Sequence, residues 1–446
     1  MTRRKKLLSV DLFCGAGGFS EGFRQAGVHT VAANDIDAWA GATYANNHPD
    51  TAFVLGDITD PEVKKKLLAI IDGRQIDIVA GGPPCQAFSQ VRNHDRVTDD
   101  PRNALYQHFL SMVSTIVPKA FVMENVVGMR NLEGGKVGEQ ILKDLSLGGA
   151  YRVRWSVLDT ADFGVPQTRR RVVAIGIRRD FEMDPPVLRS PLADERMELV
   201  RMMEGREGSV RYELPSEQTS LLSPTRSIVE HLLDRESLNY VSVEQAIGDL
   251  VGLEPCSTIV RKPSDDAEAY PSAPTSAYQR LMRAGSSAVF NLDVPSIRED
   301  TVKRLAAIPQ GGNYRDIPEK LQARYLNGKR WGPDVGRAKL SRKHYYAYRK
   351  LHPDFFSWTL NTKTDCVYHY EDLRALSVRE FARLHSFPDA YAFLNGDRHS
   401  RYAQIGNAVP PLLAKALAEH LVPLLQPADT SPPRKRASQR ESVQLS

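Results

Sequence analysis

Hydrophobic and polar positions along residues 7 to 180 predict a regular succession of strands and helices. Seven short runs are rich in Val, Ile, Leu and Phe, as in strands that are buried on both faces of a sheet. In chain order these runs are LLSVDLF, HTVAAN, AFVLGD, IDIVAGG, AFVMEN, RVRWSVL and RVVAIGI. Strands that alternate with helices favour a doubly wound α/β domain.

Helical periodicity marks segments between these strands. The segment DPEVKKKLLAII has Asp60 at its N-cap, Pro61 in its first turn and an inward-facing stripe of Val63, Leu67 and Ile71. The segments GFSEGFRQAG and NALYQHFLSMVSTIVP are also helical in pattern and end at a glycine and a proline. We expect these three helices to cover the sheet.

The regular pattern is lost between about residues 190 and 373, where the sequence is polar, contains Pro and Ser, and shows only isolated helices such as VSVEQAIGDL. Two amphipathic helices, SVREFARLHSFP and PPLLAKALAEHLVPLL, follow, and the tail PADTSPPRKRASQRESVQLS cannot support a core. We therefore predict a first domain over residues 1–190 and an irregular inserted domain over residues 191–373. Residues 374–397 would form a hinge that supports the smaller domain, and residues 398–425 would return to the first domain. Residues 426–446 would form a disordered basic tail.

Composition places the chain among globular proteins, with 41% hydrophobic residues in 446. No apolar run is long enough to span a membrane and the basic start MTRRKKLLSVDLF has no signal-peptide pattern, so we expect a cytoplasmic protein without a membrane partner. The four cysteines, at positions 14, 85, 256 and 366, are far apart and have no ligand-spaced histidines. We expect neither a metal site nor disulfides.

Positive charge is concentrated in one part of the chain. The net charge is only +5, yet residues 301 to 351 hold 13 Lys and Arg against three acids, a local balance of +10, with Tyr and Trp among them. This mixture suits a nucleic-acid backbone, although a solvated loop face has a similar composition.

Glycines and acids at the ends of the predicted strands indicate a ligand site. The first strand runs into DLFCGAGGFS, where glycines let a ligand approach the backbone and the following helix offers free N–H donors. Asp35 and Asp57 follow the second and third strands, in positions to bind ribose hydroxyls and an adenine amine. An adenosine-bearing cofactor is therefore predicted, with a tight turn and ordinary capping acids as the alternative.

Reactive side chains follow the later strands. Cys85 in GGPPCQAFSQ comes after the fourth strand, at the edge where open α/β sheets bind ligands, although a buried structural cysteine would suit this position equally. Glu124 ends AFVMEN, and GVPQTRRRVVAIG brings Gln167, Arg169 and Arg171 to a later strand. This set suits methylation at carbon 5 of cytosine after addition of the Cys85 thiolate to carbon 6, with Arg169 offsetting the charge of Glu124.

These motifs give the chain a resemblance to DNA (cytosine-5)-methyltransferases of the bacterial restriction-modification type, over about residues 8 to 180 and 374 to 425. In order, they are DLFCGAGGFSEGF, NDID, GDIT, GGPPCQAFSQ, DPRNAL, ENV, GVPQTRRR, LSVREFARLHSFPD and YAQIGNAVPP. The family implies a Rossmann-like, doubly wound sheet that binds S-adenosylmethionine. The resemblance implies cofactor contacts for Phe13, Gly15, Gly18, Asp35, Ile36, Asp57, Ile58, Leu105, Asn407 and Val409.

The resemblance also implies catalytic roles. Cys85 would be the nucleophile, Glu124 would hold the edge of the cytosine, and Arg169 and Arg171 would lie near the flipped base. Asn103, Ser377 and His385 stand where the family usually has Gly, Thr and Gln, which leaves the covalent chemistry untouched.

The inserted residues 191–373 would be the target-recognition domain for double-stranded DNA. The polar segment 89–100, which includes Gln90, Arg92 and His94, would close over the extruded base, unless it is an ordinary surface loop. A monomer that acts beside a separate restriction endonuclease is implied as well.

Other functions share some of these features. Cytosine methylation of transfer RNA is an alternative within the same chemistry, but the long basic insertion favours DNA. Amino methylation needs an aromatic residue after Asp/Asn-Pro-Pro, and the only similar string here is DPPV. A nicotinamide-dependent oxidoreductase would not need Cys85 with Glu124, and a non-catalytic DNA-binding protein would not depend on Cys85 at all.

Overall fold

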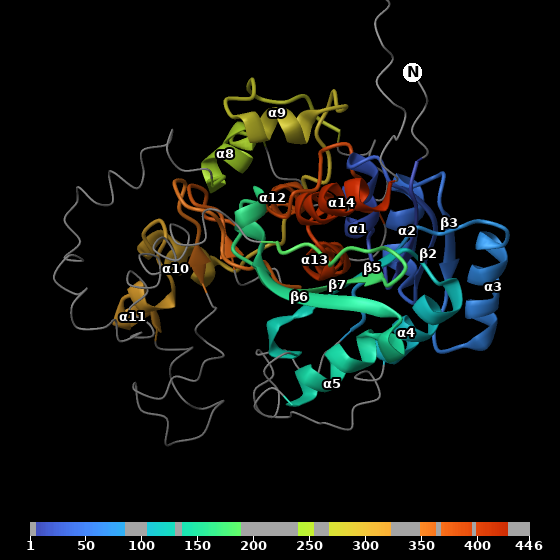
Figure 1. Cartoon of the computed structure of the whole chain (residues 1–446). Helices are drawn as coiled ribbons and strands as arrows, with labels where there is room; N and C mark the ends of the chain where they lie inside the picture. Colours follow the sequence, from blue (N-terminus) through green and yellow to red (C-terminus); the bar gives the residue numbers. More distant parts are fainter. Residues whose placement is uncertain are drawn as a thin grey trace, which may run out of the picture.

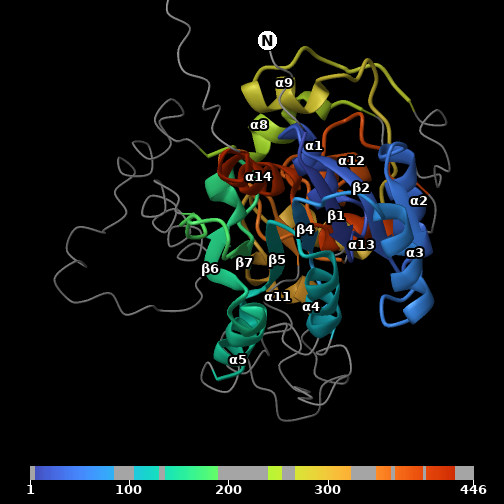
Figure 2. The same cartoon turned by 45° about the vertical axis from the view of Figure 1, so that its right-hand side comes forward.

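The computed structural model describes residues 6–84, 105–129, 136–188, 240–253, 267–322, 348–362, 367–394 and 398–426. All seven predicted strands are confirmed and form one sheet, in the order β3-β2-β1-β4-β5-β7-β6. Figure 2 labels this succession from β2 to β6. Their bounds are β1 (Leu8–Leu12), β2 (His29–Asp35), β3 (Ala52–Leu55), β4 (Ile78–Gly81), β5 (Ala120–Val126), β6 (Tyr151–Asp159) and β7 (Arg170–Arg178). The first five strands run parallel, and β7 is antiparallel to both of its neighbours, β5 and β6.

Helices cover both faces of this sheet (Figure 1). Side chains of α3, α4 and α5 form one core with the sheet, and side chains of α1 and α14 form another on the opposite face. The helices of this domain are α1 (Gly18–Gln25), α2 (Ala38–Asn47), α3 (Pro61–Ile71), α4 (Leu105–Ile116), α5 (Lys136–Leu145) and α14 (Pro411–Leu425), with short 3-10 helices η4 (Leu147–Gly149) and η5 (Thr160–Phe163). The doubly wound prediction is confirmed.

The predicted start and inner face of α3 are also confirmed. The Asp60 side chain accepts a hydrogen bond from the backbone N–H of Glu62, which satisfies one free donor of the first turn. Val63, Leu67 and Ile71 are buried. Their spacing of three to four residues places all three on one side of the helix, against the sheet.

Helix α14 lies against α1 with very little space between the backbones. A Cβ added at Gly22 would lie 2.3 Å from the Pro411 carbonyl oxygen and 2.5 Å from the Ala414 Cβ, so only glycine fits there. The stretch Ser400–Leu425 is long and apolar enough, by composition, to cross a membrane. Its Leu417 is fully buried in the core with α1, which identifies α14 as an internal helix of this domain.

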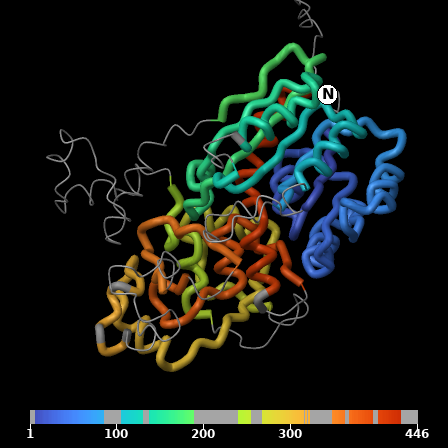
Figure 3. Tube along the Cα trace, turned by 90° about the horizontal axis from the view of Figure 1, so that it is seen from below, coloured from blue at the N-terminus to red at the C-terminus, as the bar shows by residue number. Residues whose placement is uncertain are grey.

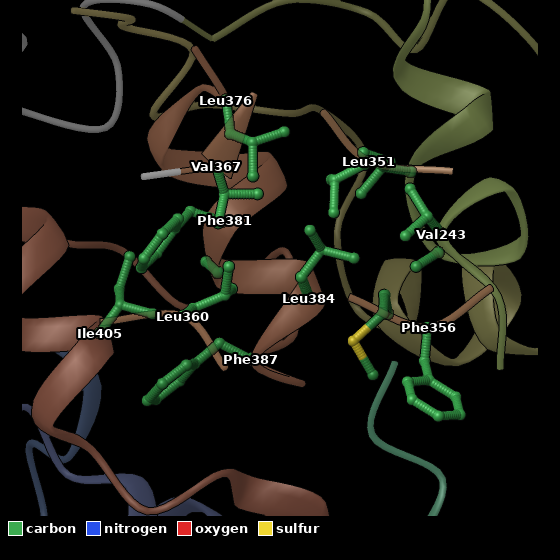
Figure 4. Packing of buried hydrophobic residues seen from close by; sticks show 14 of the residues in the cluster. Val243, Leu351, Phe356, Leu360, Val367, Leu376, Phe381, Leu384, Phe387 and Ile405 are labelled. Atoms are coloured by element: carbon green, nitrogen blue, oxygen red, sulfur yellow. The ribbon is translucent and has the colours of Figure 1, made fainter. Parts of the chain in front are cut away.

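The described residues between 240 and 408 form a second lobe beside the sheet, coloured from yellow-green to red-orange in Figure 3. Its helices and strands are α8 (Val243–Ile247), η6 (Gly248–Leu250), α9 (Ala277–Arg283), α10 (Glu299–Ala307), η8 (Tyr314–Asp316), α11 (Glu319–Gln322), β8 (Arg349–Lys350), β9 (Val367–Tyr368), α12 (Val378–Leu384) and α13 (Arg398–Asn407). Figure 4 shows the apolar centre, where Val243, Phe356 and Phe381 come from distant parts of the chain. Ala16 and Ala161 of the first domain complete the same core, so the two lobes are in direct contact.

A buried ionic cluster holds this second lobe together. Arg383 on α12 donates to Asp249 at 2.5 Å and to Asp389 at 2.6 Å, and Arg283 pairs with Asp249 at 2.5 Å. Buried charges are costly unless each has a partner, and loss of Arg383 would remove an ion-pair partner from both Asp249 and Asp389. The predicted hinge residues of α12 thus form ion pairs with the inserted segment and pack in the same apolar core.

Part of the predicted DNA-binding patch is internal. Arg304, Arg349 and Lys350 are all buried. Arg304 pairs with Asp300 at 2.9 Å, Arg349 lies over the Trp358 ring, and Lys350 donates to a backbone carbonyl. For these three the prediction that they face DNA is wrong, because a long cationic side chain can bury its stem and find an internal partner. Seven of the 13 basic residues, from 324 to 343, lie outside the described residues.

Candidate active site

The carboxyl ends of β1 and β4 lie side by side at the point where the strand order reverses. Open α/β sheets bind ligands in the crevice at such a point. The glycine-rich turn follows β1, and the Pro83-Pro84 pair follows β4. The strand arrangement therefore brings together the two motifs that the sequence assigned to cofactor and chemistry.

Glu124 and Arg171 form an ion pair at this edge. The Arg171 Nε lies 2.8 Å from the Glu124 Oε1, and the two side chains are only 14% and 12% exposed. Because β7 runs antiparallel to β5, its first residues lie at the carboxyl end of β5, where Arg171 is paired with Val126. Burial lowers the pKa of Arg171, and the Glu124 carboxylate opposes that shift.

The ion pair lies beside the start of the loop that carries Cys85. A Cβ added at Gly82 would be 3.3 Å from the Glu124 Oε2, which places the second carboxylate oxygen next to the loop backbone. The Asn125 amide donates to the Pro83 carbonyl at 2.9 Å and anchors the loop from the adjacent strand. Cys85 itself and segment 89–100 lie outside the described residues, which end at Pro84 on this side.

Arg169 occupies a different environment from the one predicted. It is 3% exposed, and its guanidinium donates to the carbonyl oxygens of Leu360 at 3.0 Å and Gly406 at 2.8 Å. Burial lowers its pKa well below the ordinary value, and the nearby charge of Arg171 adds to this effect. The direct ion pair with Glu124 is made by Arg171, so the expected charge compensation comes from the second of the two predicted arginines.

The glycine-rich turn is held by Asp35 of β2. The Gly15 N–H donates to Asp35 Oδ2 at 2.7 Å and the Asp37 N–H donates to Oδ1 at 2.9 Å. Gly15 and Gly17 have φ of +52° and +92°, a backbone conformation that favours glycine. Burial raises the pKa of Asp35, and these two N–H donors lower it. Asp35 therefore shapes the turn and keeps further lone pairs for a ligand.

The other predicted cofactor residues differ in exposure. Ile36 is 66% exposed at the sheet edge, while Ile58 is 3% exposed in the core. Asp57 is exposed and accepts from the Thr59 N–H, as a turn residue does. Phe13 and Leu105 are half-buried, Asn407 is exposed, Val409 is buried, and a Cβ at Gly18 would lie 1.9 Å from the Val409 oxygen.

Comparison with known proteins decides the family. The model of the family described as C-5 cytosine-specific DNA methylase matches residues 7–423. The chain belongs to this family. It is 33% identical to the type II methyltransferase M.DdeI of Desulfomicrobium norvegicum, over 92% of this chain and 88% of that one, and 34% identical to M.AgeI of Thalassovita gelatinovora, over 92% and 98%.

A solved structure supports the fold of this methylase. A protein described as a DNA modification methyltransferase encoded within an E. coli prophage aligns with a TM-score of 0.65 and 23% identity, over 94% of this chain and 99% of that chain. Together with the seven-stranded sheet, this confirms the predicted α/β fold of S-adenosylmethionine-dependent methyltransferases. The methylase is a DNA (cytosine-5-)-methyltransferase, as the sequence motifs indicated.

Two residues of the methylase site were missed by sequence reasoning. The motif ENV indicates no role for Asn125, although its amide anchors the loop before Cys85. No motif includes Tyr391, yet its hydroxyl donates to the Ala16 carbonyl in the glycine-rich turn. The position of Asn125 beside Glu124 was a usable signal, whereas nothing local to Tyr391 indicates a partner so distant in the chain.

Proposed function

We propose that this methylase transfers a methyl group from S-adenosylmethionine to carbon 5 of a cytosine within a specific double-stranded DNA sequence, through extrusion of the base and a covalent adduct of Cys85 at carbon 6. The observation that carries the proposal is the Glu124–Arg171 ion pair beside the backbone that leads into Cys85. A carboxylate that is buried, paired and at the ligand-binding edge of the sheet suits recognition of one polar base edge.

Glu124 and Arg171 have different roles at the base. Arg171 contacts Oε1 and leaves Oε2 on the side of the Cys85 loop, where it can accept a hydrogen bond from the exocyclic amine. An unpaired carboxylate would raise the pKa of a neighbouring thiol, and the guanidinium offsets this effect. The pair thereby keeps a carboxylate and a thiolate compatible within one site.

The covalent steps follow from the chemistry of the ring. The Cys85 thiolate would add to carbon 6 while Glu124 supports protonation at N3, so carbon 5 becomes electron-rich and can attack the methyl carbon. The bond from that carbon to the sulfonium sulfur of the donor would break, and the donor would leave as a neutral thioether. Loss of the carbon 5 proton then returns electrons to the ring and expels the thiolate, and N3 gives up its proton. Base extrusion comes first, because the stack of a duplex covers both carbons.

S-adenosylmethionine fits the residues at the other half of the site and supplies an electrophilic methyl group when bound. A Cβ added at Gly15 would meet nothing within 4 Å, so there is space above the turn. Ile36 offers an exposed apolar surface next to it, and Asp35 can accept hydrogen bonds from ribose hydroxyls. Asn407 and Val409 would hold the methionine end.

The names of the relatives support a type II restriction-modification role. We place target recognition in the inserted residues 191–373, and we expect a cytoplasmic monomer whose cognate endonuclease acts separately. Bisulfite sequencing of DNA from a host that expresses the protein would identify the methylated sequence. Comparison of methyl incorporation into duplex DNA and transfer RNA tests the substrate, and labelling of RNA only would contradict the proposal.

The covalent step has a direct test. We expect duplex DNA with 5-fluorocytosine at the target, together with the methyl donor, to trap a protein–DNA adduct, because fluorine at carbon 5 cannot leave as the proton does. Mass spectrometry should locate the bond at Cys85. Cys85→Ser should abolish the adduct and methyl transfer but retain DNA binding, while the control Cys366→Ser should retain all three. Methylation by Cys85→Ser at the normal rate would contradict the mechanism.

A further inference from the structure

Arg169 lies where three separate segments of the chain meet. Its Nη1 donates to the Leu360 carbonyl at 3.0 Å, and its Nη2 donates to the carbonyls of Gly406 at 2.8 Å and Ala408 at 3.4 Å. These acceptors belong to the second lobe and to the end of α13, whereas Arg169 precedes β7 of the sheet. One buried guanidinium therefore joins the sheet domain to two separate segments of the second lobe, at Leu360 and at the end of α13.

His385 completes this junction from α12. The Gln167 Oε1 accepts from the Leu360 N–H at 2.9 Å, so its Nε2 is the donor that faces the His385 Nδ1 at 3.0 Å. The His385 Nδ1 must then be an acceptor, which leaves Nε2–H to donate to the Ala408 carbonyl at 2.9 Å. A single neutral tautomer satisfies both contacts, and Ala408 receives hydrogen bonds from both His385 and Arg169.

The junction is situated between the two halves of the site. Arg169 is two residues before Arg171, which pairs with Glu124. On the other side, the carbonyls that Arg169 binds flank the exposed Asn407, and the next carbonyl, of Val409, lies against Gly18 at the start of α1. The distance between the base pocket and the methionine end of the cofactor site therefore depends on these hydrogen bonds.

We propose that Arg169 and His385 are positioning residues that fix the Asn407–Val409 turn relative to the Glu124–Arg171 pair, so that the methyl donor is aligned with carbon 5. This inference rests on the function proposed above. It assigns Arg169 no contact with the cytosine: both Nη atoms bind backbone carbonyls, and the residue is 3% exposed. Arg171 keeps the role at the base.

Two measurements separate alignment from base chemistry. In the absence of a methyl donor, addition of Cys85 to carbon 6, protonation of carbon 5 by solvent, loss of the original carbon 5 hydrogen and expulsion of the thiolate would release tritium from DNA labelled at that position. This exchange needs the base pocket but no aligned donor. Methyl transfer needs both the base pocket and an aligned donor. A misplacement of the donor by about 1 Å can lower the rate of methyl transfer on the order of 100-fold.

The variants are chosen to affect one half of the site at a time. Arg169→Lys should lower kcat for methyl transfer about 10- to 100-fold, with tritium exchange within about threefold of the wild type. Arg171→Lys should lower both rates. His385→Leu should behave like Arg169→Lys, whereas His385→Gln, which keeps a donor and an acceptor, should restore methyl transfer to within about threefold. His420→Gln, an exposed change on α14, is the control.

The outcomes are distinguishable. Equal losses of exchange and methyl transfer in Arg169→Lys and His385→Leu, with circular dichroism unchanged, would overturn the positioning role and favour a base contact for Arg169. Unchanged methyl transfer in both variants would overturn it as well. Absence of exchange in the wild-type enzyme would instead contradict the proposed covalent mechanism, independently of Arg169.

Discussion

The hydroxyl of Tyr391 lies against the glycine-rich turn of the proposed cofactor site. It donates to the Ala16 carbonyl and lies 3.0 Å from the His48 Nε2. A Cβ added at Gly17 would be 2.6 Å from this hydroxyl, so the tyrosine can lie this close to the turn only because residue 17 is a glycine. The second lobe therefore hydrogen-bonds to the glycine-rich turn through Tyr391, from the segment that follows α12.

We expect Tyr391→Phe to weaken binding of S-adenosylmethionine about 5- to 10-fold, because the Ala16 carbonyl loses a buried donor, a loss of roughly 1 to 1.5 kcal/mol. Calorimetry of cofactor binding measures this, and DNA affinity should stay the same. Tyr370→Phe is the matched control, since it removes a hydroxyl that bonds Glu244 in the second lobe. Equal weakening in both variants would indicate a general loss of stability.

At the level of helices, the packing of α14 on α1 closes the first domain. The backbones approach at Gly22, where a methyl group would meet both the Pro411 carbonyl and the Ala414 side chain. Leu413 and Leu417 fill the same interface from α14. Because α14 follows the second lobe in the chain, its contact with α1 packs the last described helix against the first one.

Gly22→Ala should lower the free energy of unfolding by about 1 to 3 kcal/mol, because the added methyl has no space in this interface. The sign of this change in stability is informative, because helix propensity by itself predicts that Gly22→Ala raises the free energy of unfolding by about 1 kcal/mol. Urea denaturation measures the effect. Ser111→Ala at an exposed position of α4 should leave stability nearly unchanged. Stabilisation by Gly22→Ala would contradict the close packing.

Across the whole molecule, buried histidines link stability to pH. Burial lowers the pKa of His48 to about 4 and also lowers the pKa of His369. Burial and the charge of Arg169 lower the pKa of His385 well below its ordinary value. In the opposite sense, burial raises the pKa of Asp11 to about 7. The three histidines are distributed over the sheet domain and the second lobe, so protonation of a histidine opposes folding in both, whereas protonation of Asp11 favours it.

The sign of the pH dependence follows from these shifts. A histidine with a lowered pKa contributes stability that is complete above pH 6.5 and is lost as the pH falls toward its folded value, up to about 3 kcal/mol for His48 by pH 4. Asp11 opposes the trend, because its neutral form gains stability as the pH falls from about 7. Burial also raises the pKa of Asp35, which acts in the same sense as Asp11. With three buried histidines against these two carboxyls, we expect the melting temperature to fall below pH 6.5.

Thermal unfolding from pH 8 to 4.5 measures this dependence. His48→Gln should make the decline between pH 6.5 and 4.5 shallower, because one proton-binding group is removed from the unfolded chain. The exposed His420→Gln should leave the decline unchanged. If the melting temperature of His48→Gln fell with pH as steeply as that of the wild type, His48 would not contribute to the pH dependence.

The elements and the family could be predicted from the sequence, because the patterns that indicate them are local. Apolar periodicity located the seven strands, and the Asp60 N-cap lies within two residues of the N–H that it binds. The motifs around Cys85 and Glu124 identified the family, since a thiol, a carboxyl group and a glycine-rich turn each follow a strand. Parallel strands then bring their carboxyl ends to a single edge.

Partners between distant segments were decided only by the tertiary structure. Arg171, rather than Arg169, pairs with Glu124 because β7 enters the sheet antiparallel beside β5, and a sequence pattern does not specify that register. Arg304, Arg349 and Lys350 are internal for the same kind of reason, since their partners come from other elements. The residue types by themselves determined the chemistry available to this protein, and the folded chain decided which charges meet and which side chains remain open to a ligand.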